Sequence, residues 1–321
     1  MDFSKEAIAE SFQRNYVLGT VKEVTPLKKG VANKLYKVST SEGDFVFKVA
    51  IRNTEDNRVL HEVAFLNMLS GIPSPKPIKA DSGEYLISFE GFAAFVYPFL
   101  PGEPEVKLDA HMREQAGEAL AKIHLQAVDF STPVSALRIR LWDIPGYYPL
   151  DALRESIEKI TNQKIKEAAL YTHAHIMEYH VDTEGLPKGS LHMDFKPENI
   201  LFQDGILSGI VDFDNSYIAP LTLDVAYSLL WFGTDNGLKL SHMKEFLSGY
   251  QRVRPLSLAE RASLYQYVHF LALAVVLVCA HWLFDEHLPL PESFVEWCID
   301  SFLPVHKELL IRQEEFADLL N

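Results

Sequence analysis

Hydrophobic and polar side chains alternate along much of the first hundred residues, which is the pattern of half-buried β-strands. Residues 34–40 and 44–50 flank a turn-like sequence at residues 41–43, so we expect a β-hairpin there. Residues 85–89 and 92–97 predict a second hairpin of the same kind. The N-terminal part of the chain is therefore expected to be rich in strands.

From about residue 99 onward, apolar residues recur mainly at helical spacing. Prolines and a glycine in residues 98–102 end the strand pattern, so we expect an N-terminal lobe of residues 1–98 and a C-terminal lobe of residues 99–321. A short β-like interlude is expected near residues 200–213. The predicted helices cover residues 55–70, 109–127, 151–179, 221–232, 257–284 and 292–320, with Pro304 interrupting the last.

The chain is acidic, with 30 basic and 44 acidic residues and a formal charge of -14. This charge argues against a general electrostatic attraction to nucleic acid or anionic lipid, so we expect neither nucleic acid nor a membrane as a partner. A neutral or cationic substrate fits more easily, although acidity also serves solubility alone. The content of hydrophobic residues, 48%, is that of a globular protein.

Cys279 and Cys298 are the two cysteines, and their spacing indicates neither a disulfide framework nor a thiolate zinc site. A reducing compartment is therefore expected. The N-terminus lacks the basic start and apolar core of a secretory signal. The longest apolar run, residues 270–280, is shorter than the ~20 residues that span a bilayer, and it predicts a buried helix. Together these features predict a cytoplasmic protein.

The stretch from His192 to Asn199, followed by an apolar segment that ends at Asp212, carries the most specific chemical pattern. Phosphoryl transfer to a hydroxyl needs a carboxylate that orients the nucleophile and oxygen ligands that hold magnesium on the phosphates. Asp194, Asn199 and Asp212 supply this set. Each of them alone would suit an ordinary turn or strand end, but their joint spacing is specific.

These residues resemble the catalytic loop and metal-binding aspartate of the protein-kinase-like superfamily, in particular its aminoglycoside phosphotransferase, choline kinase and homoserine kinase group. The resemblance implies that Asp194 is the catalytic base and that Asn199 and Asp212 bind the metal ion. It also implies that Asp224 braces the catalytic loop through backbone hydrogen bonds. The implied fold is α+β and two-lobed, with a small antiparallel-sheet lobe, a larger mostly helical lobe, and ATP with Mg²⁺ between them.

Lys48 lies in an otherwise apolar strand pattern, where an unpaired ammonium group would be costly to bury. The kinase resemblance implies that this lysine reaches the ATP phosphates and pairs with a helix glutamate. Glu62 is the best-placed partner on the following predicted helix, and Glu55 is the alternative. A lysine on an edge strand that extends to water is the other interpretation of Lys48.

The loop that covers the phosphates is expected before residue 34. Gly30 and Asn33 lie there without a Gly-x-Gly-x-x-Gly pattern, and they either present donors to phosphate oxygens or form an ordinary hairpin turn. By its position in the chain, the linker that contains Tyr97 and Phe99 is expected to hold the adenine ring.

The catalytic loop and the segment that follows Asp212 bear on the acceptor class. Lys196 lies in Lys-Pro-Glu-Asn, which is closer to the loop of protein kinases than to the usual small-molecule form. Against a protein substrate, the segment from Asp212 to Asp224 is short, no Ala-Pro-Glu follows, and Asp-Phe-Asp replaces Asp-Phe-Gly. Asp214, which ends that triplet, resembles a position that is often acidic in the small-molecule group. Helix capping or solvation is its alternative role.

We therefore expect an ATP- and Mg²⁺-dependent kinase that acts on a hydroxyl of a small molecule. Residues 129–185 are expected to build the acceptor site, and residues 138–148 suit an amino alcohol, such as homoserine or choline, or an aminosugar. The alternatives are a protein serine/threonine kinase, a catalytically silent nucleotide-binding regulator, and a scaffold without nucleotide. The oligomeric state has no signal in the sequence.

Overall fold

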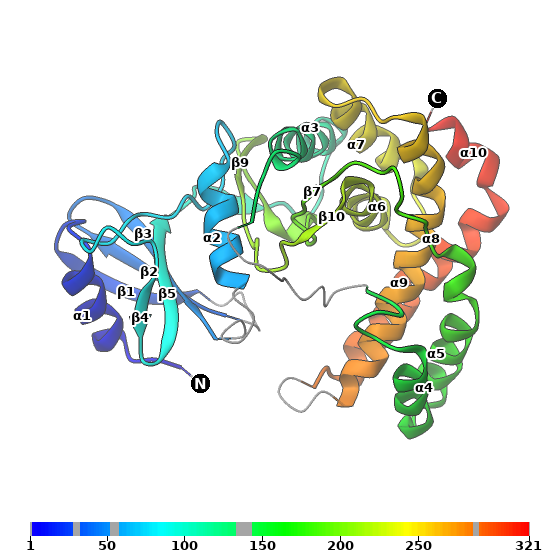
Figure 1. Cartoon of the computed structure of the whole chain (residues 1–321), viewed down its shortest axis with the longest axis horizontal. Helices are drawn as coiled ribbons and strands as arrows, with labels where there is room; N and C mark the ends of the chain where they lie inside the picture. The colour runs from blue at the N-terminus through cyan, green and yellow to red at the C-terminus, as the bar shows by residue number, and fades with distance from the viewer. Residues whose placement is uncertain (1, 28–32, 52–57, 133–142, 285–288, 321) are drawn as a thin grey trace. The chain divides into compact units, whose positions relative to one another are not determined.

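The computed structural model describes residues 2–27, 33–51, 58–132, 143–284 and 289–320. The chain forms two compact units (Figure 1). The sequence passes from one unit to the other several times. Unit 1 comprises Met1–Pro104, Asp129–Leu137 and Ile200–Ser216, and unit 2 comprises Glu105–Val128, Arg138–Asn199 and Tyr217–Asn321.

A five-stranded antiparallel sheet is the main element of unit 1. Its strands are β1 (Val21–Leu27), β2 (Lys34–Thr40), β3 (Asp44–Ala50), β4 (Ile87–Phe89) and β5 (Phe92–Pro98). They lie in the order β1-β2-β3-β5-β4. Both predicted hairpins are confirmed, because β2 pairs with β3 and β4 pairs with β5.

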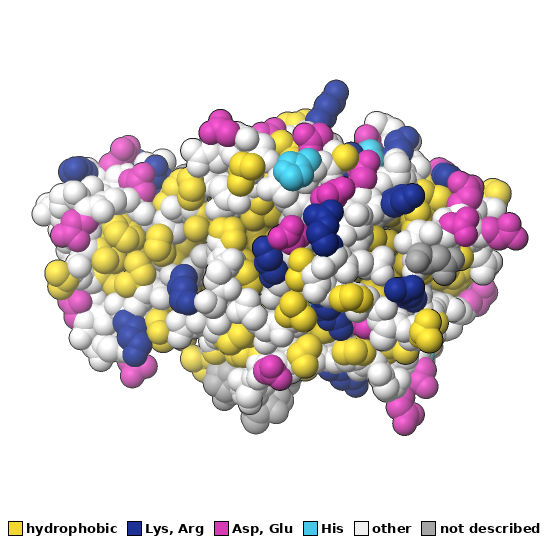
Figure 2. Space-filling view, turned by 90° about the horizontal axis from the view of Figure 1, so that it is seen from above, with side chains coloured by type: hydrophobic (Ala, Val, Ile, Leu, Met, Phe, Trp, Pro, Cys, Tyr) yellow, Lys and Arg dark blue, Asp and Glu magenta, His cyan; other side chains and the backbone are white. Residues whose placement is uncertain are grey.

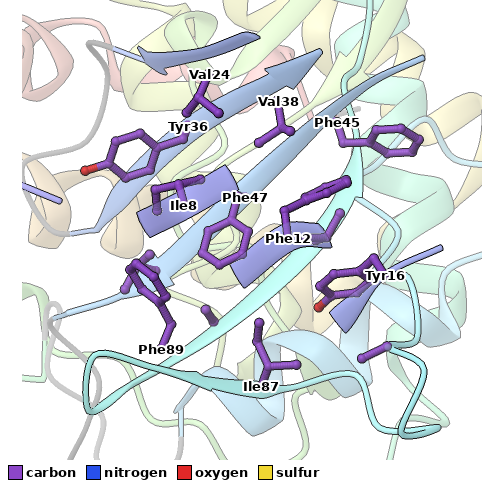
Figure 3. Close-up of a cluster of buried hydrophobic side chains, with 14 residues drawn as sticks. Ile8, Phe12, Tyr16, Val24, Tyr36, Val38, Phe45, Phe47, Ile87 and Phe89 are labelled. Carbon is purple, nitrogen blue, oxygen red and sulfur yellow. The ribbon is translucent and has the colours of Figure 1, made fainter. Parts of the chain in front are cut away.

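A helix covers each face of this sheet (Figure 1), α1 (Lys5–Asn15) on one face and α2 (Arg58–Met68) on the other. On the α1 face, Phe12 belongs to the same buried cluster as Phe47 of β3 (Figure 3). A second buried cluster joins α2 to the opposite face. Because side chains alternate across a strand, Lys48 points to the α2 face.

A three-stranded sheet completes unit 1, with β6 (Glu103–Pro104), β8 (Ile200–Gln203) and β9 (Ile206–Ile210) in the order β6-β8-β9. The hairpin of β8 and β9 confirms the predicted β-like interlude. The amide of Ile210 donates a hydrogen bond to the carbonyl of Pro73 over 2.8 Å. The end of β9 is therefore anchored to the chain that follows α2.

Helices dominate unit 2. They are α3 (Ala110–Ala127), α4 (Leu150–Lys159), α5 (Gln163–His175), α6 (Leu221–Phe232), α7 (Leu240–Val253), α8 (Leu258–His281), α9 (Glu292–Ile311) and α10 (Gln313–Asp318). A short antiparallel pair, β7 (Lys188–Ser190) and β10 (Ile218–Pro220), accompanies them.

Glycines let α3 and α7 approach each other closely. A Cβ atom at Gly117 would lie 2.0 Å from the carbonyl oxygen of Phe246, and one at Gly249 would lie 1.9 Å from that of Glu114. Neither contact is possible for a real side chain, so larger residues would push the two helices apart. The close packing brings the N-terminal half of α3 beside the middle and C-terminal part of α7.

Two predicted helix boundaries are wrong. The helix expected over residues 151–179 is divided into α4, α5 and a short 3-10 turn, because Ile160 is extended and the side chain of Asn162 caps α5. Pro304 does not interrupt the last helix, since α9 continues through it and the break comes at Arg312. The buried residues of α9 hold that helix by packing, which outweighs the local cost of proline.

Helices α1 and α7 and strand β1 are absent from the sequence-based prediction, whereas α3, α6 and α8 agree with it. The segment Leu258–Phe284, which contains α8, is long and apolar enough to cross a membrane by length and composition, the one such segment in the described part of the chain. In the structure, 78% of its most apolar window is buried. The predicted buried helix at residues 270–280 is therefore confirmed.

The molecular surface mixes charges of both signs. On the face seen in Figure 2, acidic and basic side chains are interspersed with hydrophobic ones.

Candidate active site

The loop between β7 and β8 carries the predicted catalytic motif, and α6 holds this loop in place. Asp224, in the first turn of α6, is fully buried and accepts hydrogen bonds from the amides of His192 (2.7 Å) and Met193 (2.9 Å). Burial raises the pKa of Asp224, but hydrogen bonds, led by the one from His124, outweigh burial and lower it. The expected backbone brace is therefore present, and it is anionic.

The backbone next to Asp194 adopts an unusual conformation. Met193 has a φ of 60°, in the left-handed region that residues with a side chain rarely occupy. The amide of Asp194 donates to Nδ1 of His192 over 3.2 Å, so this nitrogen carries no proton. Such a backbone persists only where its surroundings hold it, and it is common at functional sites.

Three donors surround the carboxylate of Asp194, and we call Asp194, Lys196, Asn199 and Tyr227 the aspartate cluster. The hydroxyl of Tyr227 donates to Oδ1 over 2.8 Å, and the ammonium group of Lys196 lies 2.8 Å from the same oxygen. The side-chain amide of Asn199 donates to Oδ2 and to the main-chain carbonyl of Asp194, both over 2.8 Å. Both carboxylate oxygens are therefore held in one orientation.

Tyr227 and Trp231 of α6 are absent from the sequence-based candidates. Burial, followed by the charge of Asp194, raises the pKa of Tyr227, so its hydroxyl keeps the proton that it donates. The ammonium group of Lys196 lies over the ring of Trp231, 5.0 Å from its centroid. Residues three or four apart share a helix face, so the predicted helix with Asp224 held a signal for Tyr227 and Trp231.

In unit 1 a second set of polar side chains surrounds Lys48. We call Lys48, Glu62, Asp214 and Asn33 the lysine cluster. The predicted pair is present, because Nζ of Lys48 lies 2.6 Å from Oε1 of Glu62. Lys48 also contacts Oδ1 of Asp214, whose Oδ2 accepts from the side-chain amide of Asn33. Lys48 is 4% exposed, which excludes a lysine that extends to water. Two carboxylates thus share one ammonium group.

The pKa values of this cluster reflect its excess of carboxylates. Burial, together with the charge of Asp214, raises the pKa of Glu62 to about 8 against the opposing effect of Lys48. Burial lowers the pKa of Lys48, but the charges of Asp214 and Glu62 outweigh burial and raise it. In addition, Oε2 of Glu62 is buried without a hydrogen-bond partner in the described part of the chain, which costs stability.

Asp212 lies in the short segment that follows β9. Its φ is 69°, a second left-handed backbone conformation at a predicted site residue. The next residue, Phe213, is 1% exposed and packs edge-to-face on Phe65 of α2, with ring centroids 6.0 Å apart. This buried ring anchors the segment that carries both Asp212 and Asp214.

The remaining nucleotide-side candidates lie at the end of β5. Tyr97 is 8% exposed in the buried cluster beside α2, and the amide of Phe99 donates to the carbonyl of Asp44 over 3.0 Å. Their expected contact with adenine stays a prediction. Gly30 and Glu55 lie outside the described residues.

Part of the predicted acceptor segment also lies outside the described residues, namely 133–142. Within the described part, Tyr147 is 40% exposed, and the hydroxyl of Tyr148 accepts from Nε1 of Trp282 over 3.1 Å. The amide of Tyr147 donates to the side chain of Asp143 over 3.0 Å. These contacts belong to unit 2, and their role toward an acceptor stays a prediction.

A model of the phosphotransferase enzyme family matches residues 23–256. The chain belongs to this family. Among curated relatives, the homoserine kinase of Gluconobacter oxydans (strain 621H) is 29% identical over 263 residues, which cover 79% of this chain and 81% of that protein. The homoserine kinase of Bradyrhizobium diazoefficiens is 30% identical over 268 residues, which cover 82% of this chain and 80% of that protein.

Solved structures of small-molecule kinases share the fold of this phosphotransferase. The amicoumacin kinase hAmiN, in complex with AMP-PNP, Ca²⁺ and Ami, has a TM-score of 0.71 at 17% identity, covering 96% of this chain and 97% of its own. The microcompartment-associated aminopropanol kinase has a TM-score of 0.72 at 16% identity, covering 98% and 99%. The fold is therefore α+β and protein-kinase-like, as expected. With the family, it makes this phosphotransferase a small-molecule kinase that acts on a hydroxyl group.

Proposed function

We propose that this phosphotransferase transfers a phosphoryl group from ATP, with Mg²⁺, to the hydroxyl of a small amino alcohol, with homoserine as the first candidate. The aspartate cluster carries the proposal, because it presents one carboxylate in a fixed orientation on a braced loop. The choice of homoserine rests on relatives named homoserine kinase that match 79% and 82% of the chain.

In this mechanism Asp194 accepts the hydrogen bond of the acceptor hydroxyl and orients its oxygen for in-line attack. Phosphoryl transfer has little covalent chemistry for the protein to perform, so positioning and electrostatics account for most of the catalysis. Asn199 and Tyr227 hold the carboxylate, and Lys196 places a positive charge beside it. That charge offsets the negative charge that the phosphoryl group brings.

The side chains of Asn199 and Asp212 are the proposed magnesium ligands. The amide nitrogen of Asn199 donates to Asp194, so its amide oxygen is the atom left for a metal ion. Asp212 adds a carboxylate, and Mg²⁺ in kinases takes oxygen from one or two side chains, the phosphates and water. The residues present therefore fit the ion, which supplies positive charge on the phosphates.

On the nucleotide side, Lys48 is the proposed partner of the ATP phosphates, and Glu62 holds it. Lys48, Glu62 and Asp214 comprise two carboxyl groups and one ammonium group, so Lys48 has little uncompensated positive charge to offer to phosphates alone. A divalent cation bound with the nucleotide would supply the missing positive charge. Asn33 adds an amide donor, and the adenine ring is assigned to the end of β5, at Tyr97 and Phe99.

A reducing, cytoplasmic setting is proposed as well. Cys279 and Cys298 are free and buried, and free thiols are usual in that compartment.

The test is an assay of ATP consumption with Mg²⁺ over homoserine, 1-amino-2-propanol, choline and an aminoglycoside, with the product identified by phosphorus NMR. Homoserine should be phosphorylated with the highest kcat/KM. The matched control is 2-aminobutyrate, which is homoserine without the hydroxyl and should give no turnover. Nucleotide binding without turnover on any acceptor would support a silent regulator, and phosphate on a generic protein would support a protein kinase.

A further inference from the structure

A chain of buried polar contacts in unit 2 ends at the catalytic loop and begins at the start of α8. Glu260, in the first turn of α8, forms a capping box with Ser257 and lies 2.8 Å from Nη2 of Arg254. Nη1 of Arg254 donates to the hydroxyl oxygen of Tyr250 over 3.0 Å. All four residues are at the junction of α7 and α8, and Tyr250 is fully buried.

From Tyr250 the chain continues to the brace of the loop. The hydroxyl of Tyr250 lies 2.7 Å from Nδ1 of His124 on α3, and Nε2 of His124 lies 3.2 Å from Oδ2 of Asp224. That same oxygen accepts from the amide of His192. His124 and Asp224 are both fully buried, so water does not substitute for these partners.

The direction of these hydrogen bonds follows from what each group can donate. An arginine only donates, so the hydroxyl oxygen of Tyr250 is the acceptor of the Arg254 contact. The single hydroxyl proton of Tyr250 is then available for Nδ1 of His124. Burial raises the pKa of Tyr250, so that proton stays on the hydroxyl.

The same reasoning shows which ring nitrogen of His124 carries the proton. A carboxylate only accepts, so the nitrogen of His124 that faces Asp224 carries the proton, and this is Nε2. Nδ1 is therefore the acceptor for Tyr250. Burial lowers the pKa of His124 in spite of the opposing effect of Asp224, which favours the neutral ring.

We propose that Tyr250 and Arg254 are positioning residues of the catalytic loop. They fix His124 as a neutral imidazole with its proton on Nε2. Asp224 then receives one donor from His124 and keeps its oxygens for the amides of His192 and Met193, which sets the backbone that leads to Asp194. Neither Tyr250 nor Arg254 belongs to the aspartate or the lysine cluster, so sequence motifs of the loop do not reveal them.

The close packing of α3 on α7 fixes the position of Tyr250 relative to His124. Gly249 directly precedes Tyr250, and the absence of a side chain there allows the contact with Glu114 of α3. His124 lies further along the same helix as Glu114. The two rings of Tyr250 and His124 meet edge-to-face with centroids 5.6 Å apart.

The first test is spectroscopic and does not depend on the acceptor. With nitrogen-15 histidine, Nδ1 of His124 should give the signal of an unprotonated, hydrogen-bonded nitrogen and Nε2 that of a protonated one. Tyr250→Phe removes only the hydroxyl, so the Nδ1 signal should move to that of a free lone pair. Hydrogen exchange at the amides of His192 and Met193 should become about tenfold faster. Tyr267→Phe, the same change at a buried tyrosine of α8, should alter neither.

The second test is kinetic and rests on the proposed function. Tyr250→Phe should lower kcat about tenfold and leave KM for ATP within about twofold. In a His124→Gln background, where the side chain still donates to Asp224 but no Nδ1 is present, Tyr250→Phe should change kcat less than about twofold. Arg254→Lys keeps a positive charge beside Glu260 but cannot also donate to the hydroxyl oxygen of Tyr250 as Nη1 does. It should therefore lower kcat like Tyr250→Phe.

An unchanged His124 spectrum with unchanged amide exchange in Tyr250→Phe would overturn the proposal, and so would equal kcat losses in the wild-type and His124→Gln backgrounds. Absence of turnover by the wild-type protein on every acceptor would count against the proposed function instead. The spectroscopic result would still decide the role of Tyr250.

Discussion

The lysine cluster of unit 1 has one cation beside two carboxyl groups, whereas the aspartate cluster of unit 2 has one carboxylate among three hydrogen-bond donors. Lys48 is shared by two carboxylates, and a further oxygen of Glu62 has no partner in the described residues. Asp194 is surrounded by three donors, of which Lys196 alone is a cation. The first cluster has more carboxyl groups than cations, whereas the second has one carboxylate that three donors hold in place.

This difference indicates two separate tasks. A cluster with more carboxyl groups than cations can accept a further cation, which suits a site that receives a nucleotide together with Mg²⁺. A carboxylate held by three donors has little freedom to rotate, which suits a group that orients a hydroxyl. Variants of the lysine cluster and variants of the aspartate cluster should therefore change different kinetic and binding constants.

The largest effect is expected from Lys48→Met. Removing the one cation leaves two buried carboxylates without compensation, which should destabilise the protein by about 3 kcal/mol and lower kcat/KM for ATP about a thousandfold. Denaturant unfolding and steady-state kinetics measure both. The control is Lys37→Met, which removes a lysine of the neighbouring strand β2 that pairs with Asp44 near the surface. Equal losses in the two variants would refute the special role of Lys48.

The next effect is a pH dependence of stability that originates in Glu62. Its pKa in the folded protein, about 8, lies above the unfolded value of 4.5, so between these values the folded state binds more protons. Stability from this group is complete below pH 4.5 and is lost as the pH rises through 8. Between pH 6 and pH 8 the free energy of unfolding should fall by about 2 kcal/mol.

Glu62→Gln cannot ionise and should remove this fall, while Glu42→Gln, at an exposed position, should retain it. Unfolding curves at the two pH values decide the matter. If the free energy of unfolding falls by the same amount in Glu62→Gln, the pH dependence originates in another group.

Asp214→Asn should give a smaller and more specific change. Without one negative charge, the lysine cluster should bind ADP about tenfold more tightly in the absence of a divalent cation. Calorimetric titrations with EDTA and with Mg²⁺ measure the difference. Identical affinities of the variant and the wild-type protein in EDTA would contradict the proposed neutralisation of Lys48 by Asp214.

The smallest effect is expected from Tyr227→Phe, which removes one of three donors to Asp194. The kcat should fall about fivefold with an unchanged KM for ATP, because the carboxylate gains freedom to rotate. Tyr267→Phe serves as the control for loss of a buried hydroxyl. A kcat equal to that of the wild-type protein would show that the other two donors suffice.

The sequence allowed the local parts of this account to be predicted. The β2–β3 hairpin and α6 follow from short patterns, since each depends on residues close together in the chain. The bracing role of Asp224 came from the family resemblance instead. Lys48 was predicted to need an anion because it stands in an apolar strand. Its place on the face that α2 covers was established by the structure.

Contacts between distant parts of the chain could not be predicted in this way. Asn33 and Asp214 meet across 181 positions, and Tyr250 and His124 meet across 126. The periodic spacing of hydrophobic residues along the chain does not indicate such pairs. The continuation of α9 through Pro304 likewise depends on packing that a single helix does not reveal. The sulfur atoms of Cys279 and Cys298 lie 3.9 Å apart on neighbouring helices, although their spacing suggests no relation.

The central claim is that Asp194 orients the acceptor hydroxyl while the lysine cluster serves the nucleotide. The most direct test is Asp194→Asn, assayed for kcat on the acceptor identified above and for ATP affinity by calorimetry with Mg²⁺. The account predicts a loss of about a thousandfold in kcat with the ATP Kd within about threefold of the wild-type value. Turnover at the wild-type rate would contradict it.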